Sequence, residues 1–384
     1  MIEFISKNKC NGCSACAMAC PQKCIAMVSD KMGFLYPEVE SERCIQCGLC
    51  RARCPVCSKE EQQEHTYMAE GYAALGNDWA VRKNSSSGGI FYLIARYVLS
   101  QGGVVFGAAF DDTYHSVKHI AVDSPDDLKK LQGAKYLQSD IGNSYESARS
   151  CLENGRPVLF SGTPCQISGL KSFLNKEYPN LYLQDIVCHG VPAPYVWNDY
   201  LTDLEGQYGG KVKHVAFRDK TNGWENYLLR IEFDNGEVYS NDRVNDLYMR
   251  GFLHDRFTRM SCFECAHKGI QRDADITLAD LWGIGEICPW LQDDRGTSLV
   301  IVSSPKGRFL IEQICSEICI QKVDLDNSIK HNPAIVRSAD YNPLREQFEK
   351  DFRQKPIKTV MKKYCSVSIY KRIKKAVKNW SGHR

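Results

Sequence analysis

The spacing of the cysteines constrains this chain more than any other feature of its sequence. Among 384 residues there are 19 cysteines, and ten of them lie within the first 57 positions. Eight of these ten form two copies of one pattern, in which gaps of two, two and three residues separate four cysteines and a proline follows. The two copies are Cys10-x2-Cys13-x2-Cys16-x3-Cys20-Pro21 and Cys44-x2-Cys47-x2-Cys50-x3-Cys54-Pro55.

Each copy matches the thiolate spacing that binds a [4Fe–4S] cluster in bacterial ferredoxins, and residues 1–62 are predicted to form such a domain. Three closely spaced thiolates on one loop can ligate three corners of an iron cube, while the fourth cysteine ligates the other cube. The proline that follows has no backbone N–H to donate and fixes the turn. We therefore assign one cluster to Cys10, Cys13, Cys16 and Cys54, and the second to Cys44, Cys47, Cys50 and Cys20.

Other uses of clustered cysteines fit the pattern less well. Disulfide frameworks are typical of short secreted chains, but the N-terminus lacks the long apolar stretch of a secretory signal. Zinc ribbons also use Cys-x2-Cys pairs, yet they rarely need three cysteines at successive spacings of two plus a fourth with proline. Cys24 and Cys57 stand outside the pattern and are expected to be packing residues. Reduced thiols favour the cytoplasm, where disulfides are rare.

Length and composition indicate a globular protein of two or three domains, at about 100–200 residues each. The longest apolar runs are far shorter than the roughly 20 residues that span a bilayer. Residues 353–384 hold 11 of the 49 Lys and Arg and no Asp or Glu. The other residues hold 38 basic (49 less 11) against 46 acidic side chains, a net charge of −8. A mildly acidic body is not typical of a nucleic-acid-binding protein.

Beyond a polar stretch at residues 58–65, which reads as a linker, the pattern indicates a mixed α/β or α+β body. A β-hairpin is expected over residues 228–240, because Asn235-Gly236 favours the positive φ of a tight turn. Strands are also predicted for residues 103–110, 158–161, 181–187 and 299–303, and helices for residues 90–100 and 126–131.

No dinucleotide fingerprint or P-loop is present, but Ser86-Ser87-Gly88-Gly89 directly precedes an apolar helix. Free N–H groups and the positive end of a helix attract phosphate, and glycines let an anion approach the backbone. An ordinary serine cap before a helix is the alternative, and taken alone it is the better reading.

Four later cysteines have a setting that suggests another metal site. Cys165 follows the strand at residues 158–161, Cys188 follows the strand at residues 181–187, and Cys262 and Cys265 form a Cys-x2-Cys pair. If the two strands are neighbours, Cys165 and Cys188 emerge at one sheet edge, where α/β proteins bind ligands. A zinc or redox pair with two buried cysteines is the alternative.

Six motifs in order resemble the beta-subunit family of coenzyme F420 hydrogenase/dehydrogenase. The resemblance covers about residues 68–345, in parts of about 68–150 and 155–345, and a ferredoxin domain in front is a common layout among bacterial members. The motifs are Ser-Gly-Gly at 87–89, Lys-Tyr-Leu-Gln-Ser at 135–139, Gly-Thr-Pro-Cys-Gln at 162–166, Cys-His-Gly at 188–190, Cys-x2-Cys at 262–265 and Ala-Asp-Ile-Thr-Leu-Ala-Asp-Leu-Trp-Gly at 274–283.

The resemblance implies an FAD held without a Rossmann fingerprint and a third [4Fe–4S] cluster close to it. The ligands of that cluster would be Cys165, Cys188, Cys262 and Cys265. The turn of Ser86, Ser87, Gly88 and Gly89 would bind the FAD pyrophosphate. Flavin contacts would come from Lys135, Tyr136, Gln138 and Ser139, with a place in the core as an equal alternative for Tyr136.

Two side chains are candidates for catalysis under the same resemblance. His189 follows a cysteine, and histidine can move protons near neutral pH; a structural histidine is an equal alternative. Lys220 and Trp224 would line the substrate side, although a solvated turn is the slightly better reading.

These features predict an iron–sulfur flavoprotein oxidoreductase that passes electrons from a ferredoxin-type donor through its clusters to FAD and on to a small organic acceptor. Clusters move one electron, hydride transfer moves two, and a flavin converts between them. The alternatives are a non-catalytic electron-transfer subunit of a larger complex, a reductase or dehydrogenase that uses coenzyme F420, and a zinc-stabilised binding module. Bacterial relatives are often associated with surface-polysaccharide synthesis, so a sugar- or nucleotide-linked substrate fits the resemblance.

The C-terminal segment, residues 351–384, is predicted to be a basic tail. Ile369, Ile373, Val377 and Trp380 fall at helical spacing among lysines. Such a basic amphipathic helix would touch an anionic membrane surface peripherally. A solvated helix that packs on the body is the slightly better reading.

Overall fold

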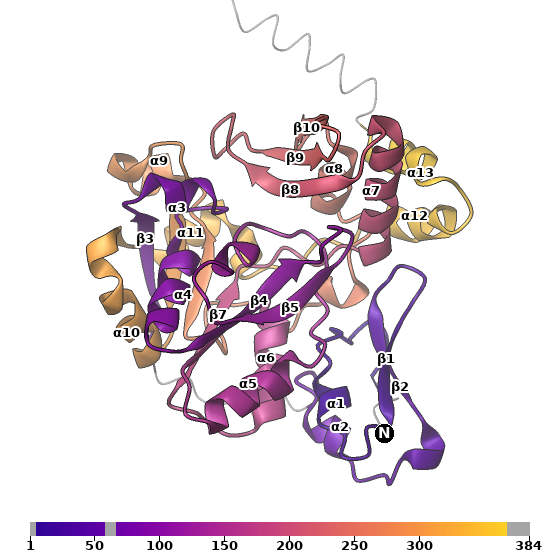
Figure 1. The fold of residues 1–384 in the computed structure, drawn as a ribbon, viewed down its shortest axis with the longest axis horizontal. Helices are drawn as coiled ribbons and strands as arrows, with labels where there is room; N and C mark the ends of the chain where they lie inside the picture. Colours follow the sequence, from indigo (N-terminus) through magenta and orange to yellow (C-terminus); the bar gives the residue numbers. More distant parts are fainter. Residues whose placement is uncertain (1–4, 58–66, 367–384) are drawn as a thin grey trace, which may run out of the picture.

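A small N-terminal domain and a larger α/β body make up the computed structural model, which describes residues 5–57 and 67–366 (Figure 1). In the small domain each of two short helices begins inside one of the cysteine runs, and a two-stranded antiparallel sheet lies between them in the chain. The elements of this domain are α1 (Ala15–Met18), β1 (Ile25–Ser29), β2 (Leu35–Val39), η2 (Ser41–Arg43) and α2 (Leu49–Ala52).

An eight-stranded mixed sheet forms the centre of the body, as the α/β pattern predicts. Its four inner strands are parallel and the strands on either side of them pair antiparallel. In spatial order the strands are β13 (Ile318–Val323), β3 (Glu70–Gly76), β12 (Ser298–Val302), β11 (Ile276–Asp280), β7 (Leu181–Ile186), β6 (Val158–Gly162), β4 (Val104–Phe110) and β5 (Val117–Val122).

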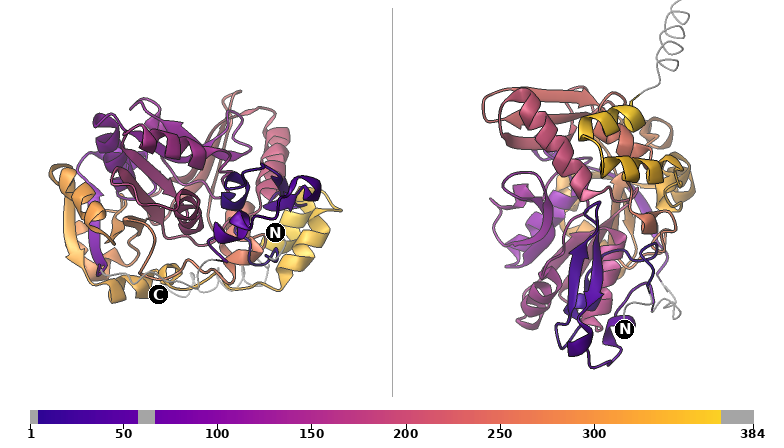
Figure 2. Two further views of the ribbon diagram at one scale, coloured as in Figure 1. Left: turned by 90° about the horizontal axis from the view of Figure 1, so that it is seen from below. Right: turned by 90° about the vertical axis from the view of Figure 1, so that its right-hand side faces the viewer.

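Helices cover both faces of this sheet, as the turned views of Figure 2 show. Strands buried on both faces read as nearly continuous apolar runs, which is why they could be located in the sequence. In β4, Val105 packs in the core beneath α4 and α10, whereas Val104 and Phe106 pack with α5 and α6 on the other face. The helices around the sheet are α3 (Trp79–Lys83), α4 (Ile90–Ser100), α5 (Ser144–Glu153), α6 (Pro164–Leu174), α9 (Ile284–Ile287), α10 (Pro305–Gln313) and α11 (Leu325–His331).

The helix predicted over residues 126–131 is only a short 3₁₀ turn, Leu128–Lys130. Leu128 and Leu131 are both buried in the core beneath α4. Side chains three residues apart eclipse in a 3₁₀ turn, so this geometry places both leucines on the same side, toward the sheet. The other short turns are η4 (Met260–Cys262), η5 (Pro289–Leu291), η6 (Cys315–Glu317) and η7 (Pro333–Ile335).

A second, three-stranded antiparallel sheet lies beside the main one and contains the predicted hairpin. Gly236 has φ of 88° at the hairpin turn, a backbone conformation that glycine adopts without strain. The elements of this part are α7 (Pro194–Tyr208), β8 (Val212–Asp219), β9 (Leu228–Phe233), β10 (Val238–Asp242), α8 (Leu247–Leu253), α12 (Leu344–Phe352) and α13 (Ile357–Cys365).

The first part of the predicted tail belongs to the body, because α13 packs on it. The ring of Phe348 lies 5.2 Å from that of Phe257 and 5.7 Å from that of Tyr364. Arg256 Nε donates to the carbonyl of Tyr364 at 3.1 Å. The amphipathic pattern at 369–380 and the linker at 58–65 lie outside the described residues. Within residues 5–57 and 67–366, no helix combines the length and apolarity that a bilayer crossing requires.

We expect Trp197→Ala to lower the free energy of unfolding by about 3–5 kcal/mol, because it removes a large side chain from a closed core. Trp197 on α7 is fully buried, packs against Phe217 of β8 in a tilted arrangement with ring centroids 4.7 Å apart, and donates Nε1–H to the carbonyl of Tyr114. Trp290, which is 71% exposed, provides the control. Its change to alanine should stay within about 0.5 kcal/mol. Urea unfolding followed by far-UV circular dichroism would compare the two variants, and equal losses would contradict the packing described.

Candidate metal centres and cofactor site

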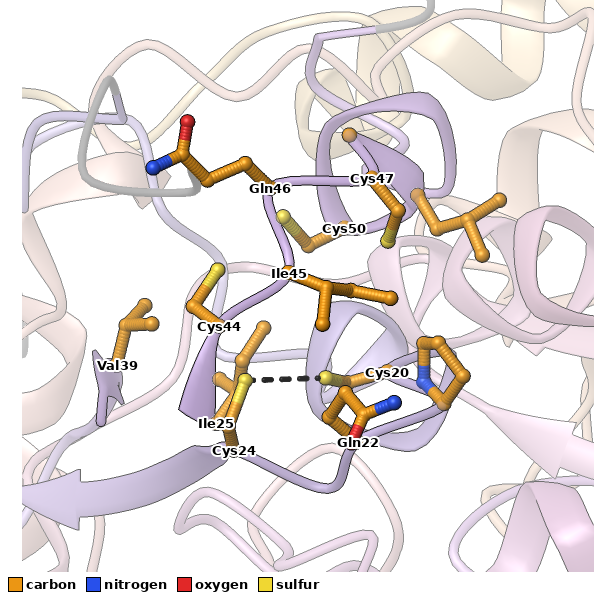
Figure 3. Close-up of a pocket in the computed structure, with 13 residues that line it drawn as sticks. Cys20, Gln22, Cys24, Ile25, Val39, Cys44, Ile45, Gln46, Cys47 and Cys50 are labelled. Carbon is orange, nitrogen blue, oxygen red and sulfur yellow. Dashed lines mark hydrogen bonds between the residues drawn. The ribbon is translucent and has the colours of Figure 1, made fainter. Parts of the chain in front are cut away.

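One pocket of the N-terminal domain is lined by four predicted ligand cysteines, three from the second run and one from the first (Figure 3). They are Cys20, Cys44, Cys47 and Cys50, and we name this the outer pocket. Cys24, expected only to pack, is indeed buried, but its sulfur also faces the pocket and lies 3.4 Å from that of Cys20. Ile45 at the pocket is 60% exposed, so the outer pocket lies close to solvent.

A second pocket, which we name the inner pocket, has the complementary set of cysteines. It is lined by Cys10, Cys13, Cys16 and Cys54. The exchange of the fourth cysteine between the two runs, predicted from the ferredoxin pattern, is therefore present in the fold. The role of these thiols as ligands stays a prediction.

The two cysteine loops share a backbone conformation as well as a spacing. On either side of the middle cysteine the first loop has positive φ at Gly12 (67°) and Ser14 (64°). The equivalent residues of the second loop, Gln46 (56°) and Gly48 (75°), have the same conformation. Residues other than glycine adopt it infrequently. Each loop therefore curls around its own pocket in the same way, as expected for an internal repeat.

The third cysteine pocket, which we name the body pocket, lies where two parallel strands end. Neighbouring strands β6 and β7 run parallel, with Gly162 beside Asp185, so Cys165 and Cys188 emerge at one edge as expected. Cys165 lies in the first turn of α6, and Cys262 ends the 3₁₀ turn η4. The four cysteines that line the body pocket are Cys165, Cys188, Cys262 and Cys265.

Burial and the crowding of thiols oppose ionisation in these pockets. In the inner pocket, burial first and the neighbouring Cys10 thiolate second raise the pKa of Cys16 to about 12. In the body pocket, burial and then Cys165 raise the pKa of Cys188 to about 12. A bound metal ion reverses this logic, because its positive charge deprotonates a coordinating thiol. Loading of the pockets would thus release protons from the chain.

The inner and body pockets are neighbours, because Asn11 lines both of them. Its amide nitrogen lies 2.8 Å from Nε2 of His267, a residue of the body. A Cβ atom placed on Gly169 of α6 would lie 3.2 Å from the sulfur of Cys13. The N-terminal domain therefore presents its inner pocket, and not its outer one, to the body.

Three charged residues around the body pocket were not predicted from the sequence. Arg259, Lys268 and Arg272 line it. A signal for two of them is present in the sequence, since Arg259 stands three residues before Cys262 and Lys268 three residues after Cys265. Charges that bracket a cysteine pair on both sides could therefore have indicated them.

His189, a predicted catalytic residue, lines the body pocket beside Cys188. Its Nε2 lies 3.2 Å from Oδ1 of Asp255, and its side chain remains 35% exposed. Asp255 is itself fixed, because it accepts a hydrogen bond from Thr258 Oγ1 at 2.9 Å. The carboxylate holds the imidazole at the border between the pocket and solvent, a position suited to proton transfer.

The Ser-Gly-Gly turn has a packing reason that the sequence did not reveal. A Cβ on Gly88 would lie 2.4 Å from the carbonyl oxygen of Ala74, so only glycine fits against β3. The Gly88 N–H donates to Ser298 Oγ at 3.0 Å, and Ser87 Oγ donates to the carbonyl of Thr297 at 2.9 Å. Gly89 has φ of 87° and begins α4 without a side-chain cap. The predicted role of the two glycines, close approach of an anion, is therefore not needed to explain Gly88.

Lys220 lies against this turn and not against open space. Its ammonium group donates to the carbonyls of Arg82, Ser87 and Arg295 at 2.8–2.9 Å. Burial, and then the nearby Arg218, lower the pKa of Lys220 to about 7. All three N–H bonds of the ammonium are used, so Lys220 holds the turn in place in this conformation.

Beside Lys220, a buried group of polar and aromatic side chains gathers around Arg218, which pairs with Asp280 of β11 at 2.7 Å. The guanidinium of Arg218 also lies 3.3 Å from the hydroxyl of Tyr136, and its Nε is buried with no hydrogen-bond partner among the described residues. Trp282 stacks on Trp224 at 4.7 Å. Trp224 is only 1% exposed, so the reading of its segment as a solvated turn was wrong for this residue.

The remaining predicted flavin contacts separate into two places. Lys135 binds the carbonyls of residues 131–133, and burial lowers its pKa to about 7. Gln138 instead joins the inner pocket, since Nε2 donates to the carbonyl of Asn11 at 3.1 Å. Ser139 is buried, and its Oγ lies 2.7 Å from Nδ1 of His119. Of the predicted cofactor contacts, Tyr136 and Ser87 therefore lie with Arg218 and Lys220, whereas Gln138 and Ser139 do not.

A compact single-ion site is not found among the residues that the structure describes. There, no three or more side chains of His, Cys, Asp or Glu gather closely enough to hold one metal ion. A zinc site would bring four thiolates to about 2.3 Å from one ion.

The sequence of the body matches a known family. The family described as the C terminus of the beta subunit of coenzyme F420 hydrogenase/dehydrogenase matches residues 155–328, which include all four cysteines of the body pocket. Residues 155–328 therefore form a domain of that beta-subunit family. Two descriptions of a 4Fe-4S dicluster domain match residues 9–57 and 40–98 of this chain, so its N-terminal part is of the iron–sulfur type that the cysteine repeat predicts.

This chain is 24% identical over 208 residues to a coenzyme F420-dependent sulfite reductase of Methanocaldococcus jannaschii. That alignment covers 53% of this chain and 31% of the sulfite reductase, so less than a third of the relative's length is represented. The N-terminal domain is 36% identical over 53 residues to VorC, a ketoisovalerate oxidoreductase subunit of Methanothermobacter marburgensis. That match covers 13% of this chain and 67% of VorC.

A solved structure with a related outline belongs to the F420-reducing [NiFe] hydrogenase complex of Methanosarcina barkeri. The TM-score is 0.48 at 15% identity, over 76% of this chain and 94% of the other. On the sequence matches alone, this chain is an iron–sulfur protein related to electron-transferring oxidoreductases.

Gly88→Ala tests the packing account of the Ser-Gly-Gly turn. The added methyl group overlaps a backbone oxygen, so we expect the free energy of unfolding to fall by about 1–3 kcal/mol. Gly206 of α7 is the control, because a Cβ there meets nothing within 4 Å. Gly206→Ala should gain about 0.5–1 kcal/mol, since alanine stabilises a helix relative to glycine. Equal stability of the Gly88→Ala variant and the parent chain would contradict this account.

Proposed function

We propose that this chain is an iron–sulfur flavoprotein oxidoreductase that exchanges single electrons with a partner protein at its outer pocket and an electron pair with a small organic molecule at its body. The observation that carries the proposal is the succession of three four-cysteine pockets, outer, inner and body. Clusters bound there would supply one-electron transfer, and a flavin would convert between single electrons and hydride.

The thiols of each pocket suit a [4Fe–4S] cluster. Each pocket offers four predicted ligand cysteines, the number that ligates one cube, and the outer pocket has Cys24 in addition. Burial opposes the ionisation of Cys20, but hydrogen bonds to the thiolate, led by the backbone and side chain of Cys24, together outweigh it and lower the pKa. This favours the thiolate that a cluster needs. No disulfide joins any of the 19 cysteines, all of which lie among the described residues, and this fits a reducing compartment such as the cytoplasm.

Exposed apolar residues at the outer pocket support docking of a redox protein there. Ile45 is 60% exposed and Leu49 is 37% exposed, and Cys47 between them is exposed as well. Interfaces between proteins that exchange electrons are small, and a short apolar patch next to the redox group suffices.

The residues around Arg218 suit a flavin in charge and in chemical type. The Nε of Arg218, which no described residue binds, would meet an anionic or carbonyl oxygen of the cofactor. Trp282 and Tyr136 would form an aromatic wall for a planar ring. In this arrangement the Ser-Gly-Gly turn, which Lys220 holds in place, would lie beside the cofactor, and His189 with Asp255 would move a proton near the body pocket.

The chemical class of the small molecule is inferred by analogy with the relatives. The matched sulfite reductase is named as coenzyme F420-dependent, so we propose a hydride-exchanging deazaflavin or a comparable organic acceptor. A second candidate is a non-catalytic electron-transfer subunit. VorC and PorD, a pyruvate synthase subunit that is 34% identical over 61 residues, are both named as subunits, which favours it. A turnover assay with reduced ferredoxin and candidate acceptors separates the two.

We expect protein purified without oxygen to hold about 12 irons per chain, four in each of three clusters. Cys265→Ser should lower that number to about 8, because it removes one ligand of the body pocket. Cys315→Ser is the control, since Cys315 is exposed and lines none of the three pockets. A parent chain with about 8 irons and no flavin would refute the third cluster and the catalytic proposal together.

Lys220→Met should weaken flavin binding about tenfold or more, because it removes the hydrogen bonds that hold the Ser-Gly-Gly turn in place, and a hydrogen bond from a charged group contributes about 1.5–3 kcal/mol. Lys213, exposed on the same strand β8, is the control. Fluorescence of extracted flavin, measured per chain after dialysis, would report the difference. Flavin retained equally by the Lys220 and Lys213 variants would remove Lys220 from the site.

A further inference from the structure

The three cysteine pockets differ in the fixed charge of their linings. Among the described residues, no Asp, Glu, Lys or Arg lines the outer or the inner pocket. The described lining of the body pocket holds three basic side chains, Arg259, Lys268 and Arg272, and no Asp or Glu. Basic side chains therefore line only the body pocket among the three, although Arg259 also contacts the inner pocket through the carbonyl of Cys10.

Arg259 is completely buried and binds neutral acceptors. Nε donates to the carbonyl of Cys10, one terminal nitrogen to that of Leu35, and the other to Oε1 of Gln138, each at 2.9 Å. The ring of Tyr36 lies 4.3 Å below the guanidinium. Within the part of the chain that the structure describes, Arg259 makes no ion pair. Because it lines the body pocket and also donates to the carbonyl of Cys10, a residue of the inner pocket, its charge acts on both pockets.

Lys268, like Arg259, donates to neutral backbone carbonyls. Its ammonium donates to the carbonyls of Cys188 at 2.5 Å and Ala334 at 2.8 Å, and no ion pair with a carboxylate is found for it among residues 5–57 and 67–366. Arg272 differs, because Asp185 lies 3.3 Å away and offsets its charge. His189, also in the lining, faces Asp255 at 3.2 Å. Two of the three cations therefore stay unneutralised by the described residues.

We propose that Lys268, whose charge adds to that of Arg259, makes the body pocket the site of highest reduction potential among the three, so that an electron entering through the N-terminal domain settles there. The inference rests on the proposed function, since it assumes clusters in the pockets. Reduction adds one negative charge to a cluster, and a nearby fixed cation stabilises the reduced form. Net charge around the cluster is among the factors that set its potential.

The proposal gives the electron flow a direction. When the inner pocket's cluster is reduced and the body pocket's cluster is oxidised, one electron leaves the first and enters the second. The inner cluster is oxidised by one electron and the body cluster is reduced by one, and no bond or proton is involved. The reductant is a low-potential one-electron carrier at the outer pocket, and dithionite takes its place in the experiment. Arg259 and Lys268 are positioning residues, because they act through the cluster's charge.

The decisive experiment is a stepwise reductive titration of the full, cluster-loaded chain with dithionite, followed by electron paramagnetic resonance at controlled potentials. The signal absent from the Cys265→Ser variant identifies the body pocket. We expect this signal to develop first in the parent chain, at the highest potential. If it develops after either N-terminal signal, or together with both, the proposal is overturned.

Substitution of Lys268 measures the size of the effect. At a fixed potential, Lys268→Met should lower the ratio of reduced to oxidised body cluster on the order of tenfold, which equals about 59 mV for a one-electron couple. Lys268→Arg keeps the charge and should keep the potential. Lys171→Met is the matched control on α6, since Lys171 lies 3.4 Å from Asp273 and its charge is offset. Equal potentials in the Lys268→Met and Lys171→Met variants would refute the role of Lys268.

The iron content of the chain distinguishes a failure of the proposed function from a failure of the inference about the cations. A parent chain with about 8 irons refutes the third cluster, and with it the proposed function. About 12 irons with the body signal reduced last refutes only the role of the cations. If Lys268→Met loses iron, the order of reduction in the parent chain still decides between these outcomes.

Discussion

The arrangement depends on one electrostatic constraint, the gathering of cysteines from distant parts of the chain into three buried or half-buried pockets. Without a positive group between them, thiolates so close repel one another, and burial adds to the cost of their charge. The pKa values of Cys16 and Cys188, both raised to about 12, express that cost. A positively charged inorganic core, as in the proposed function, would remove it. Such a core would account for the pockets, the charges beside them and the loops that curl around them.

The sequence was informative about features that depend on one short segment or on a repeating pattern of residues. Spacing alone indicated that Cys20 belongs with the second run and Cys54 with the first, because a loop too short to close a cube must borrow its fourth ligand. The apolar runs of β6 and β7 located two neighbouring parallel strands, and so placed Cys165 beside Cys188. Both predictions needed only the reach of a short segment and the rule that parallel strands end at one edge.

Roles that residues take where distant strands meet were either not predicted from the sequence or predicted differently from what the structure shows. Gly88 looked like an anion-binding glycine, yet it is required because Ala74 and Ser298 pair across β3 and β12 directly against it. Trp224 looked like part of a solvated turn, but it stacks on Trp282, which lies 58 positions later in the printed sequence. Arg259 carried no signal except its closeness to Cys262. No local pattern records the register of strands or the pairing of distant loops, so these assignments needed the fold.

Arg259 also bears on how the two domains can work together. Its guanidinium is shared among a cysteine loop and a strand of the N-terminal domain and a loop of the body. Pulling the domains apart would leave a buried cation without acceptors, which is costly. The N-terminal domain is therefore not a swinging shuttle that visits partners and returns. Under the proposed function, electrons would tunnel between the domains across a gap of constant width, and the rate of that transfer would be set when the chain folds, not by a hinge.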